Sequence, residues 1–372
     1  MLLIYNKDPA PWQKITKIQN SAGRVTEGSK YEKQSKMKRF GNLYDKICSI
    51  ENLQLADVRA RRHKEQSYGV LLHDKNRETN ILALNKSLVN QSYKTSEYNI
   101  FNIYEPKERE IYQLPYYPDR ILHHAIMNVM EPIWTSLFTS DTYSCIKGRG
   151  IHLVVKKLKR TLKENPDKTI FCLKMDIRKF YPSIDHGILK NILQKKIKDS
   201  RLLDLLFEII DSASGVPIGN YLSQFFANLY LSYLDHYLKE YLKVKYYYRY
   251  ADDMVILSES KERLHAILEE IKTYLHNNLK LELKGNYQIF PVDARSIDFV
   301  GYRFYHSHIL LRKSIKQSMC RRAAKLNKLG FITLEDYKRK VSSHVGWAKH
   351  CNSRHLLKKI IRSEYYEEIQ RA

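Results

Sequence analysis

The stretch YRYADDMVILSES, residues 248–260, places two adjacent aspartates, Asp252 and Asp253, between strongly β-forming residues. Tyrosines precede the pair and the apolar run MVIL follows it, a pattern typical of a buried β-hairpin with the acids at its tip. Neighbouring carboxylates repel each other, and a solvated turn does not need apolar flanks. Two interpretations are open at this point: an ordinary turn, or a tip that binds a divalent cation.

The composition predicts a folded protein that binds a polyanion. The 372 residues are 43% hydrophobic, enough for one large or two to three small domains with a core. Lys and Arg number 64 against 40 Asp and Glu, and the resulting charge of +24 is typical of nucleic-acid binding. A basic protein without such a ligand is the alternative. Binding to or across a membrane is disfavoured, because no run approaches ~18 apolar residues.

The five cysteines are dispersed and form no C-x-x-C pair. They predict neither a disulfide framework nor a zinc site, and we expect a cytoplasmic protein. Residues 1–40 carry nine Lys or Arg against three acids and hold no helical or strand period, which predicts a basic N-terminal extension.

The spacing of apolar residues beyond this extension predicts an α+β protein. Helices are expected from Asn42 onward and over 119–131, 187–212, from Tyr221, over 259–279 and over 312–372; strands are expected over 98–115, 170–175, 248–257 and 297–304. The last helical segment carries 16 basic residues against 5 acids, which suits a nucleic-acid backbone.

A third acid, Asp176, ends the apolar strand IFCLKM and precedes the Asp252–Asp253 pair by 76 residues. Three carboxylates at the end of one sheet require cations nearby. Hard oxygen ligands suit Mg²⁺, and two such ions can activate a 3′-hydroxyl and stabilise the departing pyrophosphate. The pattern therefore predicts nucleotidyl transfer.

These motifs resemble reverse transcriptases, and the resemblance extends from about residue 42 to about residue 360. Asp176 matches the first catalytic aspartate and Asp252 with Asp253 the Tyr-x-Asp-Asp pair, while Ile177 would offer a backbone carbonyl to one of two Mg²⁺ ions. The resemblance implies a right-hand polymerase with fingers, palm and helical thumb. The expected domains are fingers at 41–165, palm with the first aspartate at 166–186, fingers helices at 187–212, palm at 213–305 and thumb at 306–372.

The stretch GVPIGNYLSQ, residues 215–224, indicates which group of reverse transcriptases the chain resembles. Most reverse transcriptases carry Gln-Gly and Ser-Pro where this chain has Ile218-Gly219 and Ser223-Gln224. The form I-G-N-x-x-S-Q is similar to reverse transcriptases of diversity-generating retroelements, which copy a template RNA with errors at adenines. Apolar Ile218 cannot hydrogen-bond to a base, which predicts low fidelity; the alternative is that Ile218 only packs.

The resemblance implies further contacts. Tyr181 would exclude a 2′-hydroxyl from the incoming sugar. Other nucleotide contacts are expected from Lys107, Arg109, Ile218, Gly219 and Gln224, and template or primer contacts from Arg149, Ser223, Tyr250, Phe299, Gly301 and Tyr302. Tyr287 stands nearest to the family's usual lysine that protonates pyrophosphate, with Lys284 close by, so the general acid is open.

The implied partners are deoxynucleotides, template RNA, the cDNA/RNA duplex and a small helical, pentameric accessory protein. Retron, group II intron-like and phage-defence reverse transcriptases are alternatives. A non-catalytic RNA-binding protein with a polymerase-like fold is another, although the chain retains all three acids.

Overall fold

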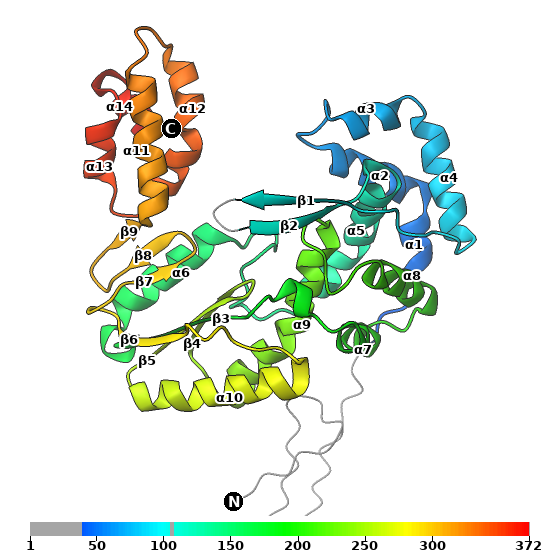
Figure 1. Ribbon diagram of the computed structural model, residues 1–372, viewed down its shortest axis with the longest axis horizontal. Coiled ribbons are helices and arrows are strands. Elements are labelled where there is room, and N and C mark those ends of the chain that lie inside the picture. Colours follow the sequence, from blue (N-terminus) through cyan, green and yellow to red (C-terminus); the bar gives the residue numbers. More distant parts are fainter. Residues whose placement is uncertain (1–38, 105–107, 372) are drawn as a thin grey trace, which may run out of the picture. The chain divides into compact units, whose positions relative to one another are not determined.

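The computed structural model describes residues 39–104 and 108–371 (Figure 1). Contacts along the chain divide it into two interleaved units. The first contains the described residues up to Ser140, together with Arg178–Lys243 and Lys272–Glu282. The second contains Asp141–Ile177, Val244–Ile271 and the chain from Leu283 onward. One long helix, α10 (Lys261–Leu279), contributes to both.

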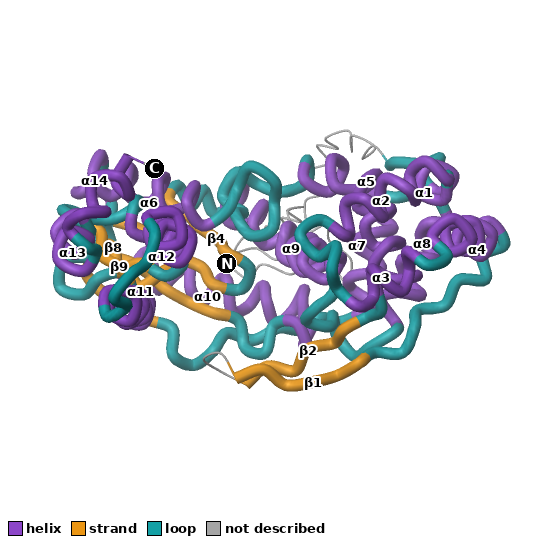
Figure 2. Tube along the Cα trace, turned by 90° about the horizontal axis from the view of Figure 1, so that it is seen from above, coloured by secondary structure: helices purple, strands orange, loops and turns teal. Residues whose placement is uncertain are grey.

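The first unit is mainly helical. Figure 2 shows its one β-hairpin extending outward from its helices, and both strands of that hairpin are largely exposed. The elements of this unit are α1 (Tyr44–Cys48), α2 (Ile50–Arg61), α3 (Tyr68–Asp74), α4 (Arg77–Val89), β1 (Asn99–Tyr104), β2 (Glu108–Gln113), η1 (Tyr116–Arg120), α5 (Ile121–Thr135), η3 (Tyr181–Ser183), α7 (His186–Lys196), α8 (Ser200–Asp211), α9 (Tyr221–His236) and η4 (Tyr237–Tyr241).

A buried carboxylate ties several helices of the first unit together. Asp57 on α2 is fully buried and accepts hydrogen bonds from Arg61, from Arg77 on α4 and from the Tyr116 hydroxyl of η1. Hydrogen bonds to the charged form outweigh the cost of burial and hold the pKa of Asp57 below its usual range. This cluster fixes the entry into α5, whose apolar face is buried.

The second unit combines two antiparallel sheets with helices. Its elements are α6 (Ile151–Glu164), η2 (Pro166–Lys168), β3 (Phe171–Asp176), β4 (Tyr246–Tyr250), β5 (Asp253–Ser258), β6 (Gln288–Pro291), β7 (Ile297–Phe299), β8 (Tyr302–Phe304), β9 (Ile309–Leu311), α11 (Lys313–Asn327), α12 (Leu334–Ala348), α13 (Arg354–Ile360) and α14 (Ser363–Arg371).

The larger sheet has the strand order β4-β5-β3-β6 and the smaller one β7-β8-β9. Helix α6 packs on the larger sheet, where the Tyr248 hydroxyl of β4 donates to Thr161 at 2.6 Å. One continuous apolar core joins α6, both sheets and α11–α14. The central strand β5 is buried except at Asp253, and β3 combines buried and half-buried residues with none exposed, as their apolar runs predict.

The α+β fold class is confirmed, with antiparallel sheets as in a right-hand polymerase palm. Most expected helices and strands also occur, with three corrections. Helix α5 continues through Pro132 to Thr135, so the proline does not end it. The helical stretch 187–212 is interrupted at Ile197, where the backbone is extended and pairs with Phe40. The alternating stretch after 297 continues into a third strand, β9, beyond the expected end at 304.

The domain boundaries stay predictions. Residues 141–165, expected in the fingers, lie in the second unit with the larger sheet. The expected extension, 1–40, lies outside the described residues except for Arg39 and Phe40, which hydrogen-bond to the chain after α7. No helix in the described part of the chain is both long and apolar enough to span a membrane.

Candidate active site

The larger sheet brings Asp176, Asp252 and Asp253 to one end of two neighbouring strands. Strands β3 and β5 pair antiparallel with Asp176 opposite Asp253. Tyr250 pairs with Asp253 across β4 and β5, so the hairpin turn consists of Ala251 and Asp252 alone. Ala251 adopts φ +55°, a conformation that costs an alanine free energy and persists only where the surroundings hold it. The acids thus meet at the hairpin tip, as the sequence predicted.

Arg249 is the residue that holds this turn, and the sequence analysis missed it. Its side chain is fully buried in β4 and donates to the backbone carbonyl of Ala251 at 3.1 Å. Its backbone also pairs with the segment at Asp141–Tyr143. A buried arginine needs hydrogen bonds to offset its desolvation, and here one of them fixes the strained turn. An arginine inside an otherwise apolar strand was the available signal.

The three carboxyls are electrostatically coupled. Burial, followed by the charge of Asp176 and a hydrogen bond with it, raises the pKa of Asp252 to about 6. Burial also raises the pKa of Asp253 to about 7; Lys174 opposes that change, and Asp176 and Asp252 add to it. Without additional positive charge, the cluster therefore retains protons near neutrality.

Two lysines partly neutralise the cluster. Lys284 Nζ lies 2.7 Å from Asp176 Oδ1, and its backbone N–H donates to the Asp176 carbonyl. Lys174 Nζ lies 3.6 Å from Asp253 Oδ2. The other oxygen of that carboxylate, Oδ1, is buried and accepts no hydrogen bond from the described residues. An acceptor left in this state is costly unless a cation or donor reaches it.

This donor set fits a divalent cation. The unpartnered Asp253 Oδ1 and the raised pKa values of Asp252 and Asp253 are what hard oxygen ligands show when positive charge is missing. In the described ranges, no three His, Cys, Asp or Glu side chains are already gathered around one metal position. Ile177, the expected backbone ligand, is buried and bridges to Leu283.

A polar cavity of about 250 Å³ opens beside Asp176 in the same unit. Lys174, Gln288 and Asp298 contribute to its wall. The Lys174 ammonium donates to the backbone carbonyl of Asp298 on β7, and the Asp298 carboxylate binds Arg312, just before α11, at 2.6 Å. The sequence analysis missed both Lys174 and Asp298; Lys174 had a signal, because it is a charged residue within an apolar strand.

The expected nucleotide contacts Tyr181, Ile218 and Gly219 lie in the first unit. The Tyr181 carbonyl accepts from the Val216 N–H at 2.9 Å, and the Ile218 carbonyl accepts from the Tyr112 N–H of β2 at 2.8 Å. Gly219 has φ +126°, and a Cβ there would stand 2.5 Å from the Tyr112 carbonyl oxygen. The glycine is therefore required for close approach of β2.

The remaining expected contacts of the first unit differ in accessibility. Gln224 on α9 is exposed, whereas Ser223 is buried, so a strand would not reach its hydroxyl directly. Arg109 on β2 is exposed and opposite Ile103. Lys107 lies outside the described residues. These positions stay predictions as nucleotide or template contacts.

The second unit corrects part of the expected primer contacts. Phe299 and Tyr302 are fully buried core residues, so their rings pack and do not face a primer. Gly301 connects them at φ +89°. Tyr250 is half-buried before the acidic tip, and Arg149 is half-buried and donates to the Thr142 carbonyl at 3.1 Å.

Replacing Gly301 with valine should destabilise the protein by roughly 2–4 kcal/mol, because φ +89° disfavours any Cβ and this one would overlap its neighbours. A Cβ at Gly301 would lie 2.5 Å from Trp347 Cζ3 and 2.8 Å from Ile315 Cδ1. Urea unfolding monitored by tryptophan fluorescence measures the change. Gly330→Val is the matched control, since no heavy atom lies within 4 Å of its Cβ position. Equal effects of both variants would contradict the packing argument.

The raised carboxyl pKa values predict how stability without divalent ions depends on pH. The ordinary value is 3.8, and folding raises it to about 6 for Asp252 and about 7 for Asp253. Between pH about 4 and pH about 7 the folded state thus binds more protons than the unfolded state, and the free energy of unfolding falls as pH rises. Asp253→Asn should remove much of this slope and stabilise the protein at pH 8 in EDTA by on the order of 2 kcal/mol. Thermal unfolding across that window tests the sign, and a wild-type stability that rises with pH would contradict it.

The fold places three acidic side chains together at one end of an antiparallel sheet. The family described as reverse transcriptase (RNA-dependent DNA polymerase) matches residues 105–304, more than half of the chain. The chain belongs to the reverse transcriptase family.

Several known proteins are similar to this chain. Protein YkfC of Escherichia coli (strain K12) is 26% identical over 234 residues, covering 51% of this chain and 61% of YkfC. The group II intron-encoded protein LtrA of Lactococcus lactis subsp. cremoris is 22% identical over 263 residues, covering 51% of this chain and 43% of LtrA. The match therefore spans less than two thirds of either relative. Apo telomerase from Candida tropicalis aligns with a TM-score of 0.47 at 12% identity, over 74% of this chain and 56% of the telomerase chain.

Proposed function

We propose that this protein is an active RNA-directed DNA polymerase that copies a template RNA into cDNA, with errors at template adenines, as part of a diversity-generating retroelement. The observation that carries the catalytic part is the meeting of Asp176, Asp252 and Asp253 at one hairpin tip, with pKa values raised for the last two. The part concerning errors rests on the I-G-N-x-x-S-Q sequence around Ile218.

The carboxylates would hold two Mg²⁺ ions, which supply activation of the primer hydroxyl and stabilisation of the leaving pyrophosphate. The chain's own residues set up this arrangement. Arg249 fixes the turn that presents Asp252, and Lys174 and Lys284 keep the acids close together despite their repulsion. Lys284 is also the proposed proton donor to pyrophosphate, because its ammonium stands 2.7 Å from Asp176 within the site.

Primer extension tests the proposal. The full chain would be incubated with Mg²⁺, four deoxynucleotides and an annealed DNA primer on an RNA template that contains adenines, with and without a neighbouring small helical protein. Sequencing of the cDNA should find errors concentrated at template adenines. Accurate cDNA would retain the polymerase and reject the diversity-generating role. If neither condition yields cDNA, the catalytic proposal fails.

Ile218→Gln should lower misincorporation at template adenines by roughly 10-fold, because a placed amide can hydrogen-bond to a base where an apolar side chain cannot. The hydrogen bond from the Tyr112 N–H to the Ile218 carbonyl does not depend on the Ile218 side chain, so the loop that contains Ile218 should keep its conformation. Error rates per template base, read from sequenced cDNA, measure the effect. Ile218→Leu is the matched control and should keep the wild-type error rate. Identical error spectra for wild type and both variants would mean that residues other than Ile218 determine the fidelity.

A group II intron-like reverse transcriptase is the second candidate, favoured by the similarity to the group II intron-encoded protein LtrA. The same sequencing experiment separates the two candidates. An intron-type enzyme would copy structured RNA without a concentration of errors at adenines, whereas the proposed type would show that concentration.

A further inference from the structure

We propose that a cavity in the first unit, between α3 and η1, binds one nucleotide of single-stranded RNA, with Lys64 and Arg120 on its phosphate and Tyr68 and Tyr117 on its base. The cavity lies entirely within the first unit and shares no residue with the acidic site. The inference rests on the proposed function for the presence of template RNA, and it names a place where the chain would hold that RNA.

The cavity has the size and lining of a ligand site. Its volume is about 820 Å³, within the roughly 300–1,000 Å³ typical of pockets that enclose small ligands. Cationic, aromatic and amide side chains line it from α3, the segment after α2, β2 and η1, together with one carboxylate, Glu97. Those that the proposal uses are Lys64, Tyr68, Asn76, Gln113, Tyr117 and Arg120.

Two cations of this cavity lack an acidic partner. In the part of the chain that the structure describes, neither Lys64 nor Arg120 forms an ion pair, and the buried Nε of Arg120 has no hydrogen-bond partner. Partial burial, followed by the charge of Arg120, lowers the pKa of Lys64. Burial, then Arg120 and two further cations, lowers the pKa of neighbouring His124 to about 4. Positive groups crowded in this way are stabilised by an anion, and a phosphate suits the planar guanidinium.

The aromatic and amide residues indicate which anion. Tyr68 has 81% of its surface exposed, so its ring is accessible to a ligand. Tyr117 is half-buried and stacks on His73 with ring centroids 5.6 Å apart, which orients its ring. Unpaired bases stack on such rings, and the side-chain amides of Asn76 and Gln113 offer both donors and acceptors to a base edge. Cation, ring and amide together favour a nucleotide over an acidic peptide.

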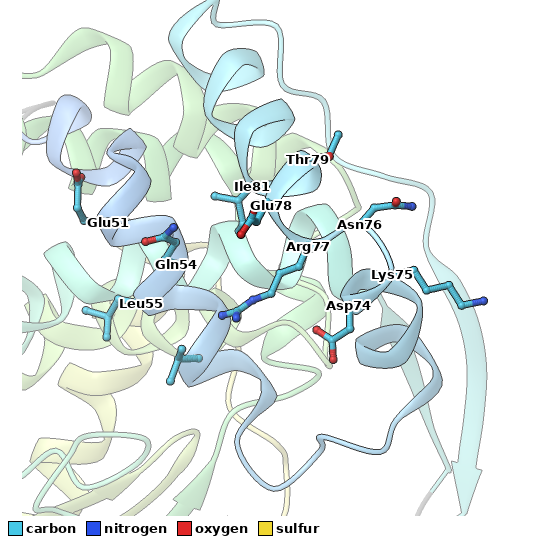
Figure 3. A pocket seen from close by; sticks show the side chains of 11 residues that line it. Glu51, Gln54, Leu55, Asp74, Lys75, Asn76, Arg77, Glu78, Thr79 and Ile81 are labelled. Carbon is cyan, nitrogen blue, oxygen red and sulfur yellow. The ribbon is translucent and has the colours of Figure 1, made fainter.

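A neighbouring cavity of the same unit lacks these features. It measures about 870 Å³ between α2 and α4 (Figure 3), and three acids, Glu51, Asp74 and Glu78, contribute to its lining. Arg77 in this cavity is already paired with Asp57 at 2.7 Å. Lys75 points away from the other labelled side chains in Figure 3 and forms no ion pair within the described ranges, so it provides a control of equal charge.

Fluorescence anisotropy with a labelled 12-nucleotide single-stranded RNA tests the inference. The full chain would carry Asp252→Asn throughout, so that binding is measured without cDNA synthesis. Tyr68→Ala should weaken binding by roughly 10-fold through loss of stacking, and Tyr68→Phe should restore it. Lys64→Ala and Arg120→Gln should each reduce the slope of log K against log salt by about 0.7, whereas Lys75→Ala should leave it unchanged.

Photocrosslinking with 4-thiouridine in the same RNA locates the contact, and crosslinks at Tyr68 or Tyr117 support the inference. Wild-type RNA affinity for Tyr68→Ala would overturn the inference. Equal effects of Lys75→Ala and Lys64→Ala on the salt dependence of RNA binding would also overturn it. Binding of free ATP in place of RNA, if it depended on Tyr68, would overturn it as well. Tyr68 is exposed, so its variants keep the test valid even if Arg120→Gln fails to fold. cDNA synthesis would be measured separately, on the same cavity variants with Asp252 intact. Normal cDNA synthesis by these proteins, with no effect of the variants on RNA binding, would reject the cavity alone. Localised RNA binding, with no cDNA synthesis by the protein that retains Asp252, would reject the polymerase alone.

Discussion

Replacing Asp252 with asparagine should reduce cDNA synthesis by at least roughly 10³-fold, corresponding to several kcal/mol of lost transition-state stabilisation. Asp252 stands in the two-residue turn between β4 and β5, and its pKa is raised to about 6 by burial and by Asp176. An amide keeps the size of the side chain but removes the negative charge that a divalent ion requires. Single-turnover primer extension at saturating deoxynucleotide measures the rate.

Asp293→Asn is the matched control, because Asp293 is an exposed aspartate of the same unit whose one ion pair among the described residues is with His306. It should leave the rate within a factor of two of wild type. The Asp252→Asn protein should also unfold at a higher temperature than wild type in EDTA at pH 8, since a repulsive charge has been removed. An inactive variant that is also less stable would indicate misfolding, and an active one would remove Asp252 from the catalytic centre.

Replacing Tyr181 with valine should reduce discrimination against ribonucleotides by roughly 10²-fold, because the ring that would collide with a 2′-hydroxyl is lost. The backbone of Tyr181 accepts from Val216 independently of the side chain, so the local turn should persist. The ratio of kcat/KM for dCTP to that for CTP, measured on one primed template, gives the discrimination directly.

Tyr181→Phe is the matched control and should retain the wild-type ratio, because the ring and not its hydroxyl is the obstacle. If valine at this position lowers incorporation of both nucleotides equally, Tyr181 is a packing residue next to Phe180, whose ring lies 5.4 Å away. The interpretation of Tyr181 as a steric gate would then be wrong.

Local patterns in the sequence predicted the parts of the fold that depend on local signals. The apolar run ending at Asp176 and the Tyr-x-Asp-Asp hairpin were sufficient to place three acids at one sheet end, because strand pairing follows from the buried faces. The helix at Tyr221 followed from its 3.6-residue period. Strand β9 was missed because three residues between the turn at 306–308 and helix α11 show too little periodicity to indicate a strand.

Residues that act through tertiary contacts could not be predicted in the same way. The sequence placed Lys284 close to the expected proton donor, but its salt bridge with Asp176 spans 108 positions of sequence and was not predicted. Phe299 and Tyr302 looked accessible as a hairpin, yet the helices that follow cover them. The cations Lys64 and Arg120 come together only through the folding of α2 and η1. The spacing of residues along the sequence does not indicate any of these contacts.

The double contact of Lys174 has a mechanical consequence. One ammonium group binds the Asp253 carboxylate and the backbone of β7, and Asp298 on that strand is anchored by Arg312 at the start of α11. A displacement of β7 away from the hairpin tip would therefore lengthen the contact of Lys174 with the Asp253 carboxylate or its hydrogen bond to the Asp298 carbonyl. Lys174 opposes the rise in the pKa of Asp253, so a displacement of the smaller sheet that drew Lys174 away from that carboxylate would raise this pKa further.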